Sequence, residues 1–395
     1  HQCLTCAFVK HGRDIPDDAE WFFCNRGCAD LYAVTSAALR DQFGAFNLNP
    51  LFDTDSYKLS HWFQYPPGTK YMMSYIESRG GKYAKTVMFG LQYYIKRYMM
   101  QRITHAHIDE MKAFATKHGE PFNEAGFRRI VDVFDGYWPV RIRSIDEGCI
   151  VDTKIPLVTI ESTDPETFWA VSWLETKLLR IWYAINVATL SYNIKEIVRR
   201  YLDKSADDTS AELPFKFQDF GCRGVSSLES AALGGAANLC HGFMGSDTIP
   251  GVVMANQYYD CDMAGYSIIA TEHSSITSWG KDHELDAYLN LIVKGAKEGV
   301  PIACVSDSYD IFNACSNLWG GDVLRRKVQD VGCLLVVRPD SGDPAEVTAK
   351  CLRLLDEKFG SKVNGKGFRV LNNVRIIYGD GINEESIKAI LDLVL

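Results

Sequence analysis

The sequence predicts an α/β protein in which a (β/α) barrel-like domain follows a mixed α+β domain and a small cysteine-bearing module. Three observations lead to this prediction. From Phe215 onward, short apolar runs alternate with segments of helical periodicity, which is typical of parallel strands covered by helices. Before Ser210 the helical and strand periodicities are mixed. Four of the twelve cysteines stand close together near the N-terminus.

We place the domains at 1–46, 47–212 and 213–395, because 395 residues are too many for one ordinary hydrophobic core. The first contains the cysteines and a linker helix, the second is the mixed domain, and the third is the barrel-like domain. A polar run with a proline, Asn47 to Pro50, marks the first boundary.

In the mixed domain, apolar residues at helical spacing predict helices over 86–100 and 169–204. Between these helices, residues 140–160 contain short β-rich runs that are interrupted by turn residues. This pattern predicts a meander or a hairpin.

The barrel-like domain contains five predicted strand–helix units. Their strands and following loops lie at 215–221, 265–273, 301–308, 333–342 and 374–381. The carboxyl ends of parallel strands meet at one edge, which is where (β/α) barrels build their sites. Five units are few for closure, so we expect further strands from the preceding domain or from sequence outside this chain.

Polar loops follow these strands and bring two arginines, one histidine and several carboxylates to the same edge. The loops are DFGCRG (219–224), ATEHSS (270–275), SDSYD (306–310), RPDSGDP (338–344) and YGDG (378–381). Arginine pairs bidentately with phosphate, carboxylates hold ribose hydroxyls or hydrated Mg²⁺, and glycine turns let backbone N–H groups approach phosphate. A single Asp at a strand end is a helix N-cap about as often as it is a functional residue. Five such loops at one edge are better explained by a common site. The chemistry that they suit is displacement at an anomeric carbon that bears pyrophosphate.

These loops, together with DSYK (55–58) and QYPPG (64–68), closely resemble the nicotinamide phosphoribosyltransferase family. The resemblance extends over 49–395 and includes the strings STDPETFWAVSWLET, DFGCRGVSS, GSDTIPG, EHSSITSWGKDHE, VSDSYDIFNAC and RPDSGDP. It implies a type II phosphoribosyltransferase fold and a homodimer with sites at the subunit interface. It also implies the reaction of nicotinamide with phosphoribosyl pyrophosphate to give nicotinamide mononucleotide and pyrophosphate.

The resemblance implies that four residues lie around the nicotinamide base. Phe220 would stack on one face, and Tyr57 of the partner chain would cover the other. Arg223 would hold the ring amide or a phosphate. Asp247 would accept a hydrogen bond from the carboxamide and repel the carboxylate of nicotinate, which disfavours a nicotinate-specific enzyme.

The resemblance also assigns the reacting end of the donor. His273 matches a histidine that ATP phosphorylates, and Glu272 beside it would orient the ring. Arg79 would reach the pyrophosphate. The catalytic set is then His273, Asp307 and Asp340, and the ribose-phosphate region with its Mg²⁺ would be lined by Asp307, Arg338, Asp340, Gly379 and Asp380.

Two alternatives stay open at this point. The family continues for about a hundred residues past the position of Leu395, with a glycine-rich loop that binds the 5′-phosphate of the donor. This sequence does not contain that segment, so it leaves the donor open. The donor could instead be a pyrophosphorylated ADP-ribose, which would give NAD directly. A catalytically idle adaptor that binds nucleotides and acts through the N-terminal module is the second alternative.

The N-terminal cysteines have the spacing Cys3-x2-Cys6-x17-Cys24-x3-Cys28. Two close pairs separated by a loop suit tetrahedral Zn²⁺, and four cysteine ligands leave no open position for catalysis. The second pair resembles the knuckle of small treble-clef zinc modules. We therefore expect a structural zinc-binding module.

The net charge of −8 and the pI of about 5.7 argue against broad binding to nucleic acid or to anionic membranes. No apolar run approaches the roughly 20 residues of a membrane span. The N-terminus lacks the pattern of a signal peptide, and the remaining cysteines are scattered through apparent helices and strands. We expect a cytoplasmic protein in a reducing compartment.

Overall fold

The computed structural model describes Gln2–Cys3, Trp21–Phe22 and residues 49–395, and the two short N-terminal segments pair as parallel strands β1 and β2. Among the described residues the chain divides into two compact units. One comprises 49–74, 96–142 and 160–178, and the other comprises 75–95, 143–159 and 179–395. The predicted zinc ligands Cys6, Cys24 and Cys28, and the side chain of Cys3, lie outside the described residues.

The first unit is mainly helical and surrounds one buried aromatic ring. Phe127 is fully buried and contacts Trp138, Trp169 and Trp173, with ring centroids 6.0, 4.7 and 4.8 Å away. Such edge-on aromatic pairs add to the stability that area burial gives. The helices of this unit are η2 (Ser56–Leu59), η3 (His61–Phe63), α4 (His105–His118), α5 (Glu124–Phe134) and α6 (Ala170–Leu179).

The β-rich region 140–160 is confirmed as strands, but they do not form a consecutive meander. The strands of this part are β3 (Met73–Glu77), β4 (Lys85–Val87), β5 (Val140–Ser144), β6 (Ile150–Asp152) and β7 (Pro156–Ser162). Three of them pair in the order β3-β7-β5, and β4 pairs antiparallel with β6.

Both helices predicted in the mixed domain begin or continue differently from the prediction. The segment 86–100 starts as strand β4, because the β-branched Thr86 and Val87 pair with β6. Gly90, with a φ of +99°, separates this strand from α3 (Leu91–Tyr94) and the π-helix η4 (Ile95–Met99). The segment 169–204 is two helices, since α6 ends at Leu179 and α7 spans Ile181–Ser205.

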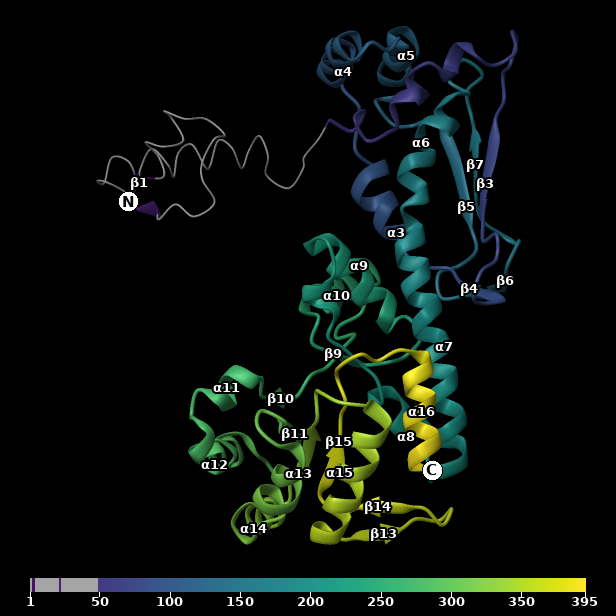
Figure 1. Cartoon of the computed structure of the whole chain (residues 1–395). Coiled ribbons are helices and arrows are strands. Elements are labelled where there is room, and N and C mark those ends of the chain that lie inside the picture. The colour runs from purple at the N-terminus through teal and green to yellow at the C-terminus, as the bar shows by residue number, and fades with distance from the viewer. Residues whose placement is uncertain (1, 4–20, 23–48) are drawn as a thin grey trace. The chain divides into compact units, whose positions relative to one another are not determined.

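The second unit contains the predicted alternation of parallel strands and helices (Figure 1). Strands β10, β11, β12 and β15 form a parallel sheet in that order, and β8 pairs in parallel with β9. A further parallel bridge joins Gly245 to Tyr266. The strands are β8 (Gln218–Asp219), β9 (Gly245–Ser246), β10 (Ile269–Ala270), β11 (Pro301–Val305), β12 (Leu334–Arg338), β13 (Ser361–Val363), β14 (Arg369–Leu371) and β15 (Val374–Ile376).

Each of the five predicted strands is followed by a helix, as the sequence indicated. The structure adds a sixth pair, β9 with α10, which the apolar pattern missed because β9 is only two residues long. The helices are α8 (Thr209–Glu212), η5 (Leu213–Phe215), η6 (Gly221–Gly224), α9 (Leu228–Leu239), α10 (Ile249–Tyr258), α11 (His273–Thr277), η7 (Lys281–His283), α12 (Glu284–Gly295), α13 (Ile311–Asn313), η8 (Ala314–Trp319), α14 (Asp322–Val331), α15 (Pro344–Phe359) and α16 (Glu384–Val394).

The core of this unit lies between the parallel sheet and its helices. Leu335 and Val337 of β12 are fully buried and pack with Leu324 of α14 and Leu355 of α15. At the end of β11, the hydroxyl of buried Ser306 accepts a hydrogen bond from Trp319 Nε1 (3.0 Å). These contacts hold the strand ends, and therefore the loops that follow them, on a rigid base.

Helices α9 and α10 touch through their backbones. A Cβ placed on Gly251 would lie 2.5 Å from Cα of Gly235, so only glycines permit this approach. None of the helices in the described part of the chain is long and apolar enough to cross a membrane.

Candidate active site

The loop after β8 presents Phe220 and Arg223. The carboxylate of Asp219 accepts a hydrogen bond from the N–H of Gly221 (2.8 Å), which bends the chain directly after Phe220. The ring of Phe220 is 39% exposed, and Arg223 is exposed on the 3-10 turn η6. An aromatic ring that is accessible at a strand end is available to stack on a flat ligand.

The loop after β9 places Asp247 beside this first loop. The N–H of Asp247 donates to the carbonyl of Asp219 (2.9 Å), so the two loops are joined by a backbone hydrogen bond. The N-cap of α10 is Thr248, so Asp247 is not used as the helix cap. One oxygen of its carboxylate accepts a hydrogen bond from the hydroxyl of Ser267, which leaves the second oxygen for a donor on a ligand.

His273 and Asp307 form a hydrogen-bonded pair across the loops after β10 and β11. Nε2 of His273 lies 3.1 Å from Oδ1 of Asp307. The other oxygen of Asp307 accepts from the N–H of Asp340 (3.0 Å) and the hydroxyl of Ser341 (2.6 Å). The carboxylate is 5% exposed, whereas the histidine side chain is 47% exposed. The aspartate is therefore fixed in orientation, and the imidazole is accessible.

Glu272 does not hold the histidine ring in the way the sequence suggested. Its carboxylate accepts a hydrogen bond from Ser274, and its N–H donates to the hydroxyl of Ser275 (3.2 Å). These contacts stabilise the first turn of α11. The hydrogen-bond partner of the imidazole is Asp307 instead.

Arg338 and Asp340 form a two-bond fork at the end of β12. Nη2 donates to one carboxylate oxygen (2.8 Å) and Nε to the other (3.3 Å). Gly379 packs against this fork, since a Cβ added there would lie 2.7 Å from Oδ1 of Asp340. The guanidinium of Arg338 also lies 5.6 Å from the ring centroid of Phe220. The arginine therefore connects the loop of Phe220 with those of Asp340 and Gly379.

The phenol of Tyr378 lies near several of the predicted carboxylates. Burial raises its pKa, and the negative charges of Asp380, Asp307 and Asp340 raise it further. Its hydroxyl donates to the carbonyl of Gly342 (2.8 Å), which joins the loops after β12 and β15. Asp380 itself is exposed. Three predicted carboxylates are thus close enough to act on one side chain.

Two predicted residues lie elsewhere in the chain. Tyr57 belongs to the first unit, where its ring is 57% exposed and contacts His61 edge-on at 4.7 Å. Arg79 is exposed in the connection between β3 and β4, within the second unit. Contacts between loops connect eight of the predicted ligand-binding and catalytic positions of the second unit: Phe220, Asp247, His273, Asp307, Arg338, Asp340, Gly379 and Asp380. Arg223 is exposed on the same loop as Phe220.

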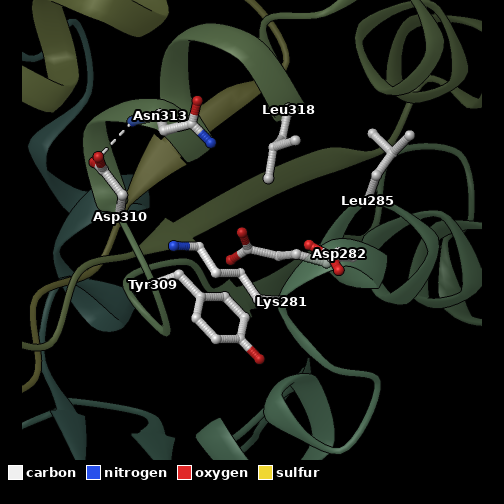
Figure 2. A pocket seen from close by; sticks show the side chains of 8 residues that line it. Lys281, Asp282, Leu285, Tyr309, Asp310, Asn313 and Leu318 are labelled. Carbon is white, nitrogen blue, oxygen red and sulfur yellow. Dashed lines mark hydrogen bonds between the residues drawn. The ribbon is translucent and has the colours of Figure 1, made fainter.

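A pocket of about 310 Å³ lies next to these loops, between the start of α12 and the loop after β11 (Figure 2). Lys281, Tyr309 and Asp310 border it, and it contains none of the predicted ligand-binding residues. Its wall carries one lysine among several carboxylates, so it does not suit a diphosphate. The hydrogen-bonded loops, rather than this pocket, are therefore the candidate active site.

Among residues 49–395, no group of three or more His, Cys, Asp or Glu side chains is arranged to hold a metal ion. Asp307 and Asp340 are already engaged by His273, Ser341 and Arg338.

Comparison with known proteins agrees with the loop motifs. Residues 49–142 match the model of the N-terminal domain of nicotinamide phosphoribosyltransferase, and residues 215–394 match that of the nicotinate phosphoribosyltransferase family. A protein of Xanthomonas campestris pv. campestris (strain 8004), named nicotinamide phosphoribosyltransferase, is 55% identical over 344 residues. The match covers 87% of this chain and 73% of that protein. This chain belongs to the nicotinamide phosphoribosyltransferase family.

More distant proteins place the family in a wider structural context. A nicotinamide phosphoribosyltransferase of Acinetobacter baylyi (strain ATCC 33305 / BD413 / ADP1) is 30% identical, with 88% of this chain and 75% of that protein covered. The crystal structures of human nicotinic acid phosphoribosyltransferase and of nicotinate-nucleotide pyrophosphorylase from Pyrococcus furiosus share the fold. The human structure has a TM-score of 0.57 at 18% sequence identity and covers 86% of this chain and 70% of its own chain. The Pyrococcus furiosus structure has a TM-score of 0.56 at 19% sequence identity and covers 88% of this chain and 70% of its own chain. The type II phosphoribosyltransferase fold follows.

Sequence reasoning missed two hydroxyl groups in this nicotinamide phosphoribosyltransferase family member. Ser267 orients Asp247, and Ser341 orients Asp307. Both serines lie inside strings used for the resemblance or next to predicted loops, but their partners are 20 and 34 residues away. Only the register of the parallel strands brings each pair together.

Proposed function

We propose that this protein transfers nicotinamide to the anomeric carbon of phosphoribosyl pyrophosphate, giving nicotinamide mononucleotide and pyrophosphate for NAD salvage. The observation that carries the proposal is the 5.6 Å approach of Arg338 to Phe220. A phosphate-binding cation and an exposed aromatic platform thereby border the same space. A pyridine stacked on Phe220 would lie next to a diphosphate paired with Arg338. The names of the similar proteins support the same reaction.

In the proposed reaction the residues position the substrates and stabilise charge. The lone pair of the pyridine nitrogen forms the new C–N bond while the C–O bond to pyrophosphate breaks, and its electrons leave with pyrophosphate. No proton has to move at the ring. Arg223 and Arg338 would offset the charge of the leaving group, and Asp340 would favour the positive charge that develops on the ribose.

The base would be selected by Asp247. Ser267 occupies one of its carboxylate oxygens, so the other would accept a hydrogen bond from the carboxamide N–H₂. The carboxylate of nicotinate would meet a like charge at this position. The site therefore supports nicotinamide rather than nicotinate as the substrate.

Mg²⁺ would enter with the donor, held by its phosphates and by hydrated contacts to Asp340 and Asp380. ATP would serve as a coupled phosphate donor to His273. Because Asp307 engages Nε2, the nitrogen left for the phosphoryl group is Nδ1. Both roles form part of the proposal.

Assembly and the N-terminal module complete the proposal. A homodimer would let the exposed Tyr57 of a partner chain cover the second face of the pyridine, and the β/α units of 213–395 would belong to a (β/α) barrel. Cys3, Cys6, Cys24 and Cys28 would bind one structural Zn²⁺, which their spacing supports. Metal analysis of the purified chain tests this: about one zinc per chain is expected, and loss of zinc in Cys24→Ser/Cys28→Ser. Wild-type protein without zinc would contradict the module.

The reaction is tested by incubating the full chain with nicotinamide, Mg²⁺ and either phosphoribosyl pyrophosphate or pyrophosphorylated ADP-ribose. The product is then identified by mass spectrometry. Nicotinamide mononucleotide from the first donor is expected, at a rate that ATP increases. NAD from the second donor alone would transfer the proposal to that reaction. Nucleotide binding with turnover at background would show an idle binding protein and overturn it.

A further inference from the structure

The connection that carries Arg79, residues 78–84, is held at its base by two backbone hydrogen bonds. The N–H of Lys154 donates to the carbonyl of Ser78 (2.8 Å), and the N–H of Thr153 donates to that of Ala84 (3.0 Å). Between these points lie Gly80 and Gly81, with φ angles of +104° and +147°. Glycines in left-handed conformations have large conformational freedom, so the base contacts alone do not fix Arg79.

Lys82 and Tyr83, near the C-terminal end of this connection, make a second set of contacts. The hydroxyl of Tyr83 donates to Oε2 of Glu384 (2.9 Å), and the ammonium group of Lys82 pairs with the same carboxylate. The Glu384 side chain is 6% exposed. Burial and the hydrogen bond to Glu384 raise the pKa of Tyr83 to about 12, so the phenol keeps its proton as a donor. Hydrogen bonds to a buried charge are the strong ones.

Glu384 also belongs to the segment that follows the glycine turn of β15. It is the first residue of α16, whose N-cap Asn383 accepts a hydrogen bond from the N–H of Ser386 (2.9 Å). Asp380 precedes Glu384 by four residues. Lys82 follows Arg79 by three residues, which span at most about 11 Å. The carboxylate of Glu384 thus joins the connection that carries Arg79 to the start of α16, the helix that follows the loop of Asp380.

We propose that Glu384 is a positioning residue for Arg79, which it holds through Lys82 and Tyr83 in a constant position relative to the 379–381 loop. The proposal rests on the proposed function and on the family resemblance, by which Arg79 would reach the diphosphate of the donor. An arginine that is ordered before the donor arrives loses less conformational entropy on binding. The contact then acts on the donor and not on nicotinamide.

A double-mutant cycle tests this on the full chain. Glu384→Gln keeps the shape of the side chain but removes its charge, and Tyr83→Phe removes one donor. Glu385→Gln is the matched control, because Glu385 contacts Lys82 at 3.4 Å from an exposed position on the same helical turn. Arg79→Ala gives the second side of the cycle. The measurements are KM for each substrate, kcat, and binding of Mg–pyrophosphate by calorimetry.

Both Glu384→Gln and Tyr83→Phe should raise KM for phosphoribosyl pyrophosphate about tenfold and leave KM for nicotinamide within about twofold. Glu385→Gln should change neither. In the Arg79→Ala background, Glu384→Gln should add nothing further, because its effect passes through Arg79. Equal effects of Glu384→Gln with and without Arg79, or a lower Tm with unchanged KM values, would overturn the proposal.

Calorimetry separates this inference from the proposed function. If the wild type binds Mg–pyrophosphate but makes no product, the function fails while the cycle is still measured on binding. If Arg79→Ala leaves pyrophosphate binding and donor KM unchanged, the positioning role fails, whatever reaction the protein catalyses.

Discussion

The imidazole of His273 and the carboxylate of Asp307 are joined by a 3.1 Å hydrogen bond between loops that follow two neighbouring parallel strands. The other oxygen of Asp307 is held by Ser341 at 2.6 Å. Replacing Ser341 with alanine should leave this oxygen with only the N–H of Asp340, which loosens the carboxylate and lowers kcat about tenfold, with KM for nicotinamide unchanged. Steady-state kinetics checks this.

Ser341→Thr is the matched variant, because it restores the hydroxyl. It should recover most of the lost kcat, and nitrogen chemical shifts of His273 should return to the wild-type values. Equal kcat in wild type and Ser341→Ala would show that the serine does not orient this pair.

Gly379→Ala should disrupt the fork between Arg338 and Asp340. The added methyl group would lie 2.7 Å from Asp340 Oδ1 and 3.4 Å from Arg338 Nε, so one of the two side chains has to move. A displacement of about 1 Å in such a site lowers kcat/KM by roughly a hundredfold. The loss should appear with little change in Tm. An active variant whose crystal structure keeps both hydrogen bonds would refute this role for the glycine.

Asp247→Ser should narrow the preference for nicotinamide over nicotinate. The change removes the negative charge that would face the base in the proposed function, so nicotinamide would lose a strong acceptor and nicotinate would lose a repulsion. We expect the ratio of the two kcat/KM values to fall by about tenfold or more. Competition between the two bases, followed by product mass, measures this ratio directly. An unchanged ratio would remove Asp247 from the specificity mechanism.

Glu284→Gln should stabilise the protein at neutral pH. Burial is the main cause that raises the pKa of Glu284 above its usual 4.5, and Asp310 adds to it. The folded state thus binds this proton more tightly than the unfolded state does. The resulting stability is fully present below about pH 4.5 and is lost as the pH rises through the raised pKa.

Glutamine still accepts the hydrogen bond from Tyr288, which is 2.8 Å from Glu284 Oε1. The Tm of Glu284→Gln should therefore exceed that of the wild type by about 2 °C at pH 7.5, and this difference in Tm should vanish near pH 4. Glu357→Gln, at an exposed position on α15, is the control and should show no difference at either pH. A constant gain at all pH values would point to packing rather than ionisation.

Much of the second unit was predictable from local patterns. Apolar runs such as the one ending at Val337 signal buried parallel strands whatever the tertiary partners are. The polar loop after each strand could then be placed at one edge. Strand β9 was missed, because Gly245 and Ser246 carry no apolar side chain and are recognised only by pairing with Gln218 and Asp219.

The mixed domain was less predictable, because its pairings are long-range. Thr86 and Val87 lie within an apolar run that suits a helix as well as a strand, and only β6, more than sixty residues later, decides between them. The same reason hides the roles of Ser267, Ser341 and Glu384, whose partners are distant in sequence. The assigned roles of the site residues stay predictions until they are tested.

The glycine contact between α9 and α10 has a consequence for how substrate preference evolves. The loop of Phe220 leads into α9 and that of Asp247 leads into α10, and the helix backbones meet at Gly235 and Gly251. The distance between Phe220 and Asp247 therefore depends on how closely the helices that follow their loops pack. A methyl group at either glycine would force the helix backbones apart, so a substitution there should change the spacing of Phe220 and Asp247 and, with it, the choice of base that we propose for this site.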